Sequence, residues 1–111
     1  MSYRVVITDT VTELIREHAR YIAVHERLPE RAAKWLNKVF DAAEALAVRP
    51  RRYGYAAEHG SRPYEVRRVN VGGCQLRFTI ADKQRIVYVI GFRHGHQLPR
   101  PGRLPEVQPE E

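Results

Sequence analysis

Side chains that can transfer a proton or stabilise negative charge gather in the second half of this 111-residue sequence. The candidates for proton transfer are His94, His96, Glu58 and Glu65, and the candidates for charge stabilisation are Arg68, Arg77 and Arg93. On a strand the two histidines would point to the same side, but two imidazoles without a third ligand make a poor transition-metal site. The single cysteine, Cys74, excludes an intrachain disulfide and a cysteine zinc cluster. We expect no metal and no cofactor.

The net charge of +6 is unevenly distributed along the chain. Residues 1–48 hold seven basic and seven acidic side chains, and residues 49–103 hold twelve basic and three acidic ones, a net charge of +9. The last eight residues carry a net charge of −3. The basic segment favours a polyanionic partner, either a nucleic acid or an acidic protein segment, unless the charge serves only solubility.

Nothing in the sequence indicates a membrane or a secreted protein. No apolar run approaches the ~20 residues that cross a bilayer, and the N-terminus goes directly into a strand-like stretch without a signal peptide's apolar region. We therefore expect a cytoplasmic protein.

Two amphipathic helices must follow a short first strand, Tyr3–Thr8. Thr10 and Glu13 fit a capping box, and an apolar stripe at helical spacing continues from there to about Arg27. Pro29 suits the first turn of a second helix that ends before Pro50. Because the link between them is short, the two helices must form an antiparallel hairpin.

Three strand signals follow a loop at residues 50–62. The first, Tyr64–Val71, changes phase, which a β-bulge near Arg67-Arg68 would reconcile. After the turn Asn70-Val71-Gly72-Gly73, residues 74–81 alternate as a strand with one solvent-exposed face. Ile86–Phe92 is apolar in both phases and predicts an interior strand.

The order of elements predicts a two-layer α+β fold: an N-terminal strand, an antiparallel helix hairpin, then a three-stranded antiparallel meander that completes one sheet. The predicted domain spans residues 1–96. Residues 97–111 hold four prolines and are predicted to form a flexible tail.

This order resembles the RelE/ParE toxin superfamily over roughly residues 3–96. The most specific stretch is residues 65–78, which is similar to the family's strand–turn–strand signature, with Cys74 in place of the usual aromatic residue. The ending at residues 90–95 and the segment Ala33-Lys34-Trp35-Leu36 also match family patterns. The resemblance implies the toxin of a type II toxin–antitoxin system, neutralised by a small antitoxin that wraps a segment around it.

The superfamily divides into RelE-like and YoeB-like mRNA endonucleases, which act on the ribosome, and ParE-like poisons of DNA gyrase. His94 falls where the YoeB-like branch has a histidine near its end, but an arginine of that branch falls at Gln75, which carries no charge. His94-Gly95 is instead the usual ParE-like ending. The favoured interpretation is therefore a ParE-like toxin without catalytic residues.

Two alternatives stay open: an mRNA endonuclease, and a degenerate module that binds an antitoxin but is not toxic. If the chain is a nuclease, its catalytic residues would be His94, Arg77, Arg68 and Arg93. The expected partners are the antitoxin and DNA gyrase (or the ribosome and mRNA), with no membrane and no small-molecule substrate. The residues expected to bind a protein partner are Arg51, Arg52, Arg67, Arg68, Arg77 and Arg93.

Overall fold

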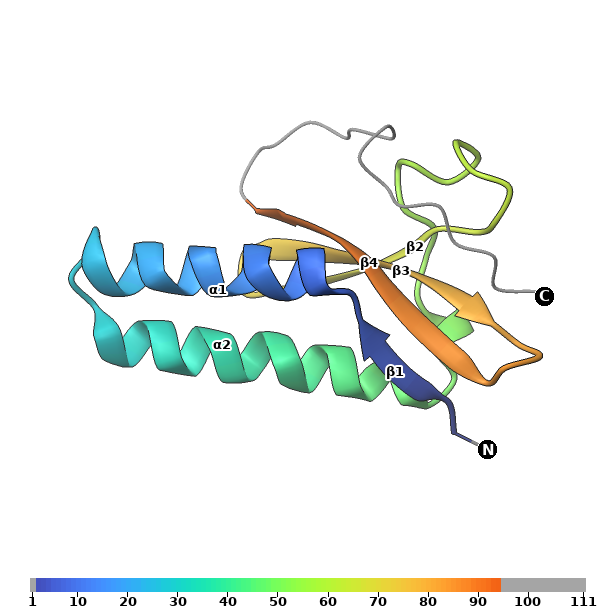
Figure 1. Ribbon diagram of the computed structural model, residues 1–111, viewed down its shortest axis with the longest axis horizontal. Coiled ribbons are helices and arrows are strands. Elements are labelled where there is room, and N and C mark those ends of the chain that lie inside the picture. The colour runs from blue at the N-terminus through green and yellow to red at the C-terminus, as the bar shows by residue number, and fades with distance from the viewer. Residues whose placement is uncertain (1, 95–111) are drawn as a thin grey trace.

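A computed structural model describes residues 2–94, which form a helix hairpin packed on one mixed sheet (Figure 1). The elements are β1 (Arg4–Ile7), α1 (Asp9–Val24), α2 (Pro29–Glu44), β2 (Arg67–Val71), β3 (Cys74–Ala81) and β4 (Ile86–His94). The strand order is β1-β4-β3-β2, with β1 parallel to β4 and the later strands antiparallel to one another. The predicted fold class is confirmed. The predicted tail, residues 97–111, and His96 lie outside the described residues.

Both helices form as predicted, but α1 begins earlier than the capping box placed it. Thr8 is the N-cap: its backbone is extended and its hydroxyl accepts a hydrogen bond from the backbone N–H of Val11 at 3.4 Å. Thr10 therefore lies inside the first turn, and the predicted cap at Thr10 is wrong. The helix ends at Val24, before Arg27, whose left-handed backbone (φ 55°) turns the chain toward α2.

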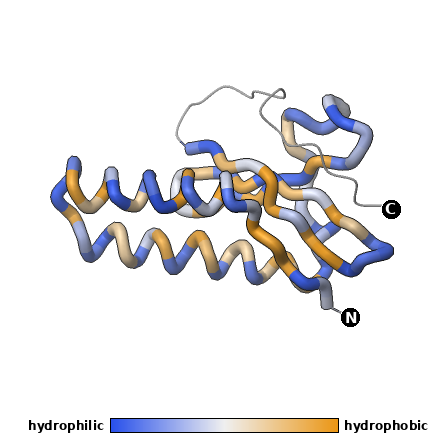
Figure 2. The backbone as a smooth tube through the Cα atoms, viewed as in Figure 1, coloured by the Kyte–Doolittle hydropathy of each residue, from blue (hydrophilic) through white to orange (hydrophobic). Residues whose placement is uncertain are grey.

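The main core lies between the hairpin and one face of the sheet, where the apolar stripes of both helices meet the central strands (Figure 2). Ile15 and Val39 from the helices and Phe78, Val87 and Val89 from the sheet are fully buried. Each such side chain contributes roughly 1.5–3 kcal/mol by leaving water. β4 lies between β1 and β3, as its two apolar phases predicted.

The other face of the sheet is covered by the segment that connects α2 to β2. Residues 54–56 run beside the start of β2, with the N–H of Ala56 donating to the carbonyl of Val66 at 2.9 Å. Ala56, Val66 and Ile90 belong to a second buried cluster on this face. The solvent-exposed face predicted for β3 is wrong, because this cover leaves Thr79 fully buried.

The bulge predicted near Arg67-Arg68 is also wrong. β2 starts at Arg67 and pairs regularly with β3, so the residues before it belong to the covering segment. The irregularity lies on β4 instead: Arg77 pairs with Gly91 and Phe78 pairs with Val89, which makes Ile90 the extra residue. Consequently Phe92, two residues further along, returns to the helix side of the sheet.

Candidate functional site

A polar patch crosses the end of the sheet on the face away from the helices. Arg68 pairs with Arg77 and Asn70 pairs with Gln75 across β2 and β3, and Gln75 pairs with Arg93 across β3 and β4. The Gln75 amide donates to Asn70 at 3.0 Å, and its oxygen accepts from the Arg93 guanidinium at 3.2 Å. We call Arg68, Asn70, Gln75 and Arg93 the outer-face patch. The neutral side chain of Gln75 thus connects Asn70 to Arg93 and orients the Arg93 guanidinium.

Arg77 lies beneath the covering segment rather than on the surface of this patch. Its side chain is buried, and its Nε lies 3.2 Å from a carboxylate oxygen of Glu58, which is itself only 1% exposed. Burial lowers the pKa of Arg77 below its ordinary value, the Glu58 carboxylate opposes that shift, and the charge of Arg93 adds to it. Arg77 and Glu58 therefore form an internal ion pair. The roles considered from the sequence, charge stabilisation by Arg77 and proton transfer by Glu58, would require the covering segment to move.

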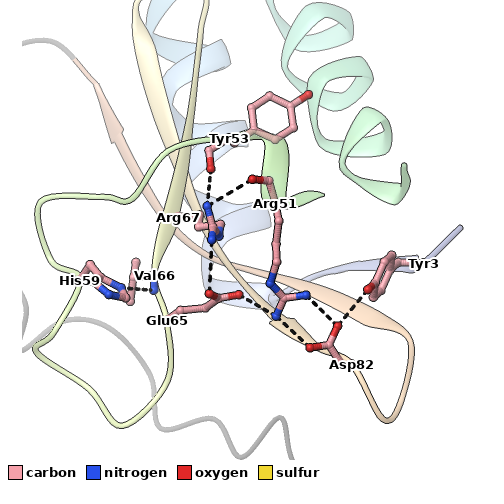
Figure 3. Close-up of polar contacts among 8 residues, drawn as sticks. All are labelled: Tyr3, Arg51, Tyr53, His59, Glu65, Val66, Arg67 and Asp82. Carbon is pink, nitrogen blue, oxygen red and sulfur yellow. Dashed lines mark hydrogen bonds and ion pairs between the residues drawn. The ribbon is translucent and has the colours of Figure 1, made fainter. Parts of the chain in front are cut away.

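Arg51 and Arg67 are also engaged inside the chain (Figure 3). The Arg51 guanidinium donates two hydrogen bonds of 2.8 Å to Asp82 and lies 3.0 Å from Glu65. Arg67 lies 3.5 Å from Glu65 and donates to the carbonyl of Tyr53 at 2.6 Å. This network fastens the covering segment to the turn between β3 and β4. Both arginines, expected to bind a partner, have their charge largely balanced by carboxylates.

Asp82 is the acidic centre of that network, and it was not singled out from the sequence. The Arg51 guanidinium holds the pKa of Asp82 below its ordinary value, and the Tyr3 hydroxyl, which donates to the carboxylate at 2.9 Å, adds to the effect. No local signal identified Asp82, because it stands in a turn 31 residues from Arg51. Only the tertiary fold brings them together.

The remaining expected contact residues keep more of their charge available. Arg52 donates to the Tyr53 hydroxyl at 2.8 Å, and Arg68 donates through Nε to the carbonyl of Tyr55 at 3.1 Å. Neither of these acceptors is negatively charged. With Arg93, whose described hydrogen bond also goes to a neutral group, they form the cationic set that is accessible to a partner.

His94 lies on the other side of the sheet from Arg68, Arg77 and Arg93. Its ring contacts His18 of α1 in a tilted arrangement with 4.4 Å between ring centroids, and His18 contacts Trp35 at 4.8 Å. Phe92 completes this aromatic group, 6.1 Å from Trp35. The cluster was missed from the sequence because His18 and His94 belong to elements far apart in the chain. Spacing along α1 placed His18 only at the edge of the core.

The free energy of unfolding should depend on pH through His18. Burial, then the charge of His94, lower the pKa of His18 below 6.5, while Glu26 raises it. A depressed histidine pKa means that the unfolded state binds the proton more readily, so this contribution is complete above pH 6.5 and is lost as the pH falls. We expect the free energy of unfolding in urea to fall between pH 7.5 and 5.5.

A matched pair of variants checks this assignment. His18→Gln should flatten the pH dependence, whereas His25→Gln, on the exposed end of the same helix, should leave it intact. Asp82 does not contribute in this range, because its lowered pKa acts only below its ordinary value of 3.8. An unchanged pH profile in His18→Gln would contradict the prediction.

Among residues 2–94, no three histidine, cysteine, aspartate or glutamate side chains lie close enough together to hold a metal ion. No helix in this range has the length and apolar character to cross a membrane. Cys74 is buried, and its desolvation raises the pKa of the thiol to about 11, so it is not a reactive thiolate at neutral pH.

One strand before a helix hairpin and three after it, joined in one mixed sheet, define the α+β architecture of RelE/ParE-like toxins. A family model described as the ParE toxin of the type II toxin–antitoxin system parDE matches residues 5–99. The chain belongs to this family, and the resemblance seen in the sequence is confirmed. A toxin of this family has an antitoxin as its partner. No curated protein and no solved structure matches the chain significantly.

Proposed function

We propose that this toxin acts in the cytoplasm by binding DNA gyrase, and that it does not cleave RNA. The observation that carries the proposal is the separation of the candidate nuclease residues by the sheet. His94 contacts His18 of α1 on the helix side, whereas Arg93 donates a hydrogen bond to Gln75 on the opposite face. A nuclease must bring its proton-transfer group and its cations to one phosphate, which requires contacts of about 3 Å.

The ionic contacts of the other candidates support the same proposal. Arg77 is buried against Glu58, and Glu65 is held by Arg51 and Arg67. Neither carboxylate is placed to accept a proton from a bound 2′-hydroxyl, because each faces an internal guanidinium. Gln75 supplies no charge to the outer-face patch. A protein that works by binding another protein needs none of these groups to be catalytic.

The antitoxin would be recognised by accessible cations. An acidic antitoxin segment that folds on binding would meet Arg52, Arg68 and Arg93, whose described partners are neutral oxygens. The internal contacts of three further arginines hold the surface in place; these are Arg51, Arg67 and Arg77.

We therefore expect Arg93→Ala to weaken antitoxin binding, mainly by lowering the association rate constant. The loss should be larger at low salt.

Expression from a tightly regulated promoter tests the proposal directly. Inhibition of supercoiling by purified gyrase, together with DNA breaks in cells and intact mRNA, is the expected result. His94→Ala should retain this activity, with Arg31→Ala on the exposed side of α2 as a matched surface control. Site-specific mRNA cuts that disappear in His94→Ala would contradict it and establish the endonuclease alternative. Normal growth under strong expression without antitoxin would favour the degenerate module.

A further inference from the structure

A second basic site lies at the opposite end of β4 from His94. It is a cavity of about 620 Å³ lined by Tyr3, Arg49, Pro50, Arg51, Arg52 and Arg85. Three chain segments meet there: the residue before β1, the connection after α2, and the turn that leads into β4. The volume lies in the range of small-molecule sites, and no acidic residue belongs to the lining.

The four arginines of this cavity are not equivalent. Arg51 is held by two hydrogen bonds to Asp82 and by its contact with Glu65, so its guanidinium is fixed and neutralised (Figure 3). Among residues 2–94, the guanidinium groups within 4.0 Å of a carboxylate are those of Arg51, Arg67 and Arg77. Arg49, Arg52 and Arg85 are not among them. Arg52 bonds only a tyrosine hydroxyl, and Arg85 lies over the Tyr3 ring at 4.4 Å. Arg49 and Arg52 therefore line the cavity without a carboxylate partner, and Arg85 has only the more distant Asp82, whose pKa its charge helps to lower.

Two of these arginines occupy backbone conformations that favour glycine. Arg49 has φ 45° and Arg85 has φ 58°, in the left-handed region that side chains disfavour by roughly 1–2 kcal/mol. Glycine at either position would remove that strain. Arginine adds a guanidinium group at each position, and both residues line the same cavity.

We propose that this cavity binds a di- or triphosphate group, either free or carried by a nucleoside. A guanidinium group can donate two parallel hydrogen bonds to phosphate oxygens, and three arginines with no carboxylate within 4.0 Å supply the positive charge that a diphosphate needs. The cavity is too large for one phosphate alone. The site is separate from the outer-face patch and shares only Arg52 with the cations proposed to bind the antitoxin. Phosphate binding through Arg49 can therefore fail without affecting the proposed gyrase and antitoxin binding, and the reverse is also true.

Calorimetric titration of the purified full-length protein with pyrophosphate at physiological salt tests the site. Wild type should bind, and Arg49→Gly should weaken binding by about tenfold or more, since a charge-assisted contact is lost. Its thermal midpoint should stay equal or rise, because the left-handed strain is relieved. Arg52→Gln should weaken binding as well and provides a second variant at an unstrained position.

Lys38→Gln, which removes the same charge from the exposed side of α2, should bind as wild type does. Equal losses in Lys38→Gln and Arg49→Gly, or no binding by wild type, would overturn the proposal. ATP and pyrophosphate distinguish the source: similar affinities indicate that the phosphates alone are recognised, and tighter ATP binding indicates a nucleoside. Binding of a short oligonucleotide without pyrophosphate binding would also overturn it, as that indicates a general polyanion surface.

Discussion

Arg77→Met should destabilise the protein by about 3–5 kcal/mol, because it leaves the Glu58 carboxylate buried without its cation. Neither oxygen of Glu58 accepts a hydrogen bond from the described residues, so Arg77 is its compensation within that range. The double variant Arg77→Met with Glu58→Leu should recover most of the loss. Replacing a buried ion pair by apolar side chains removes the desolvation cost of both charges.

Urea unfolding of the two single variants and the double variant measures this coupling. Arg93→Met is the matched control, because it removes a cation from the same face that bonds a neutral amide, and it should change the free energy of unfolding by less than about 1 kcal/mol. If Arg77→Met proves as mild as Arg93→Met, the covering segment does not depend on the pair, and Arg77 would be available to a ligand.

Gly72→Ala should cost about 2–3 kcal/mol of stability through two separate effects. Gly72 has φ 58°, so a side chain there adds about 1–2 kcal/mol of backbone strain. A Cβ would also lie 2.9 Å from Nε1 of Trp35, which donates a 3.0 Å hydrogen bond to the Gly72 carbonyl. The indole must shift and weaken that bond, which costs about 1 kcal/mol more.

Gly73→Ala separates the two effects. Gly73 also has a left-handed backbone (φ 79°), but a Cβ there meets nothing within 4 Å. It should therefore cost only the strain, and the difference between the two thermal midpoints gives the contribution of Trp35. Equal losses in the two variants would show that the indole is not held by the turn between β2 and β3.

The periodic elements of this fold could be predicted from sequence, and the covering segment could not. The helical stripes and the apolar phases of Ile86–Phe92 report burial directly, because regular elements repeat their contacts. Residues 54–66 have no period, so nothing predicted that they cover β3 and bury Arg77. Alternation along β3 then suggested a solvent-exposed face that tertiary packing removes.

The position of the β-bulge could not be predicted from the sequence either. A change of phase is visible only where polar and apolar residues alternate, and β4 is apolar on both sides around Ile90. The extra residue was therefore assigned to Arg67-Arg68, where the alternation of a loop resembled that of a strand. The bulge decides that His94 lies on the helix side and Arg93 on the outer face, so the sequence could not predict which face each candidate residue occupies.

The parallel pairing of β1 with β4 has a consequence for synthesis on the ribosome. Arg4 pairs with Ile86, so the first strand to emerge has no neighbour in the sheet until the last strand has been translated. Such distant pairing slows folding, because a long loop must close before the contact is gained. The helix hairpin has local contacts and can form early, but its apolar face stays exposed until the sheet has formed. A nascent chain therefore becomes a folded toxin only after β4 has been translated. Before then, a partner that binds exposed apolar segments could already reach the hairpin.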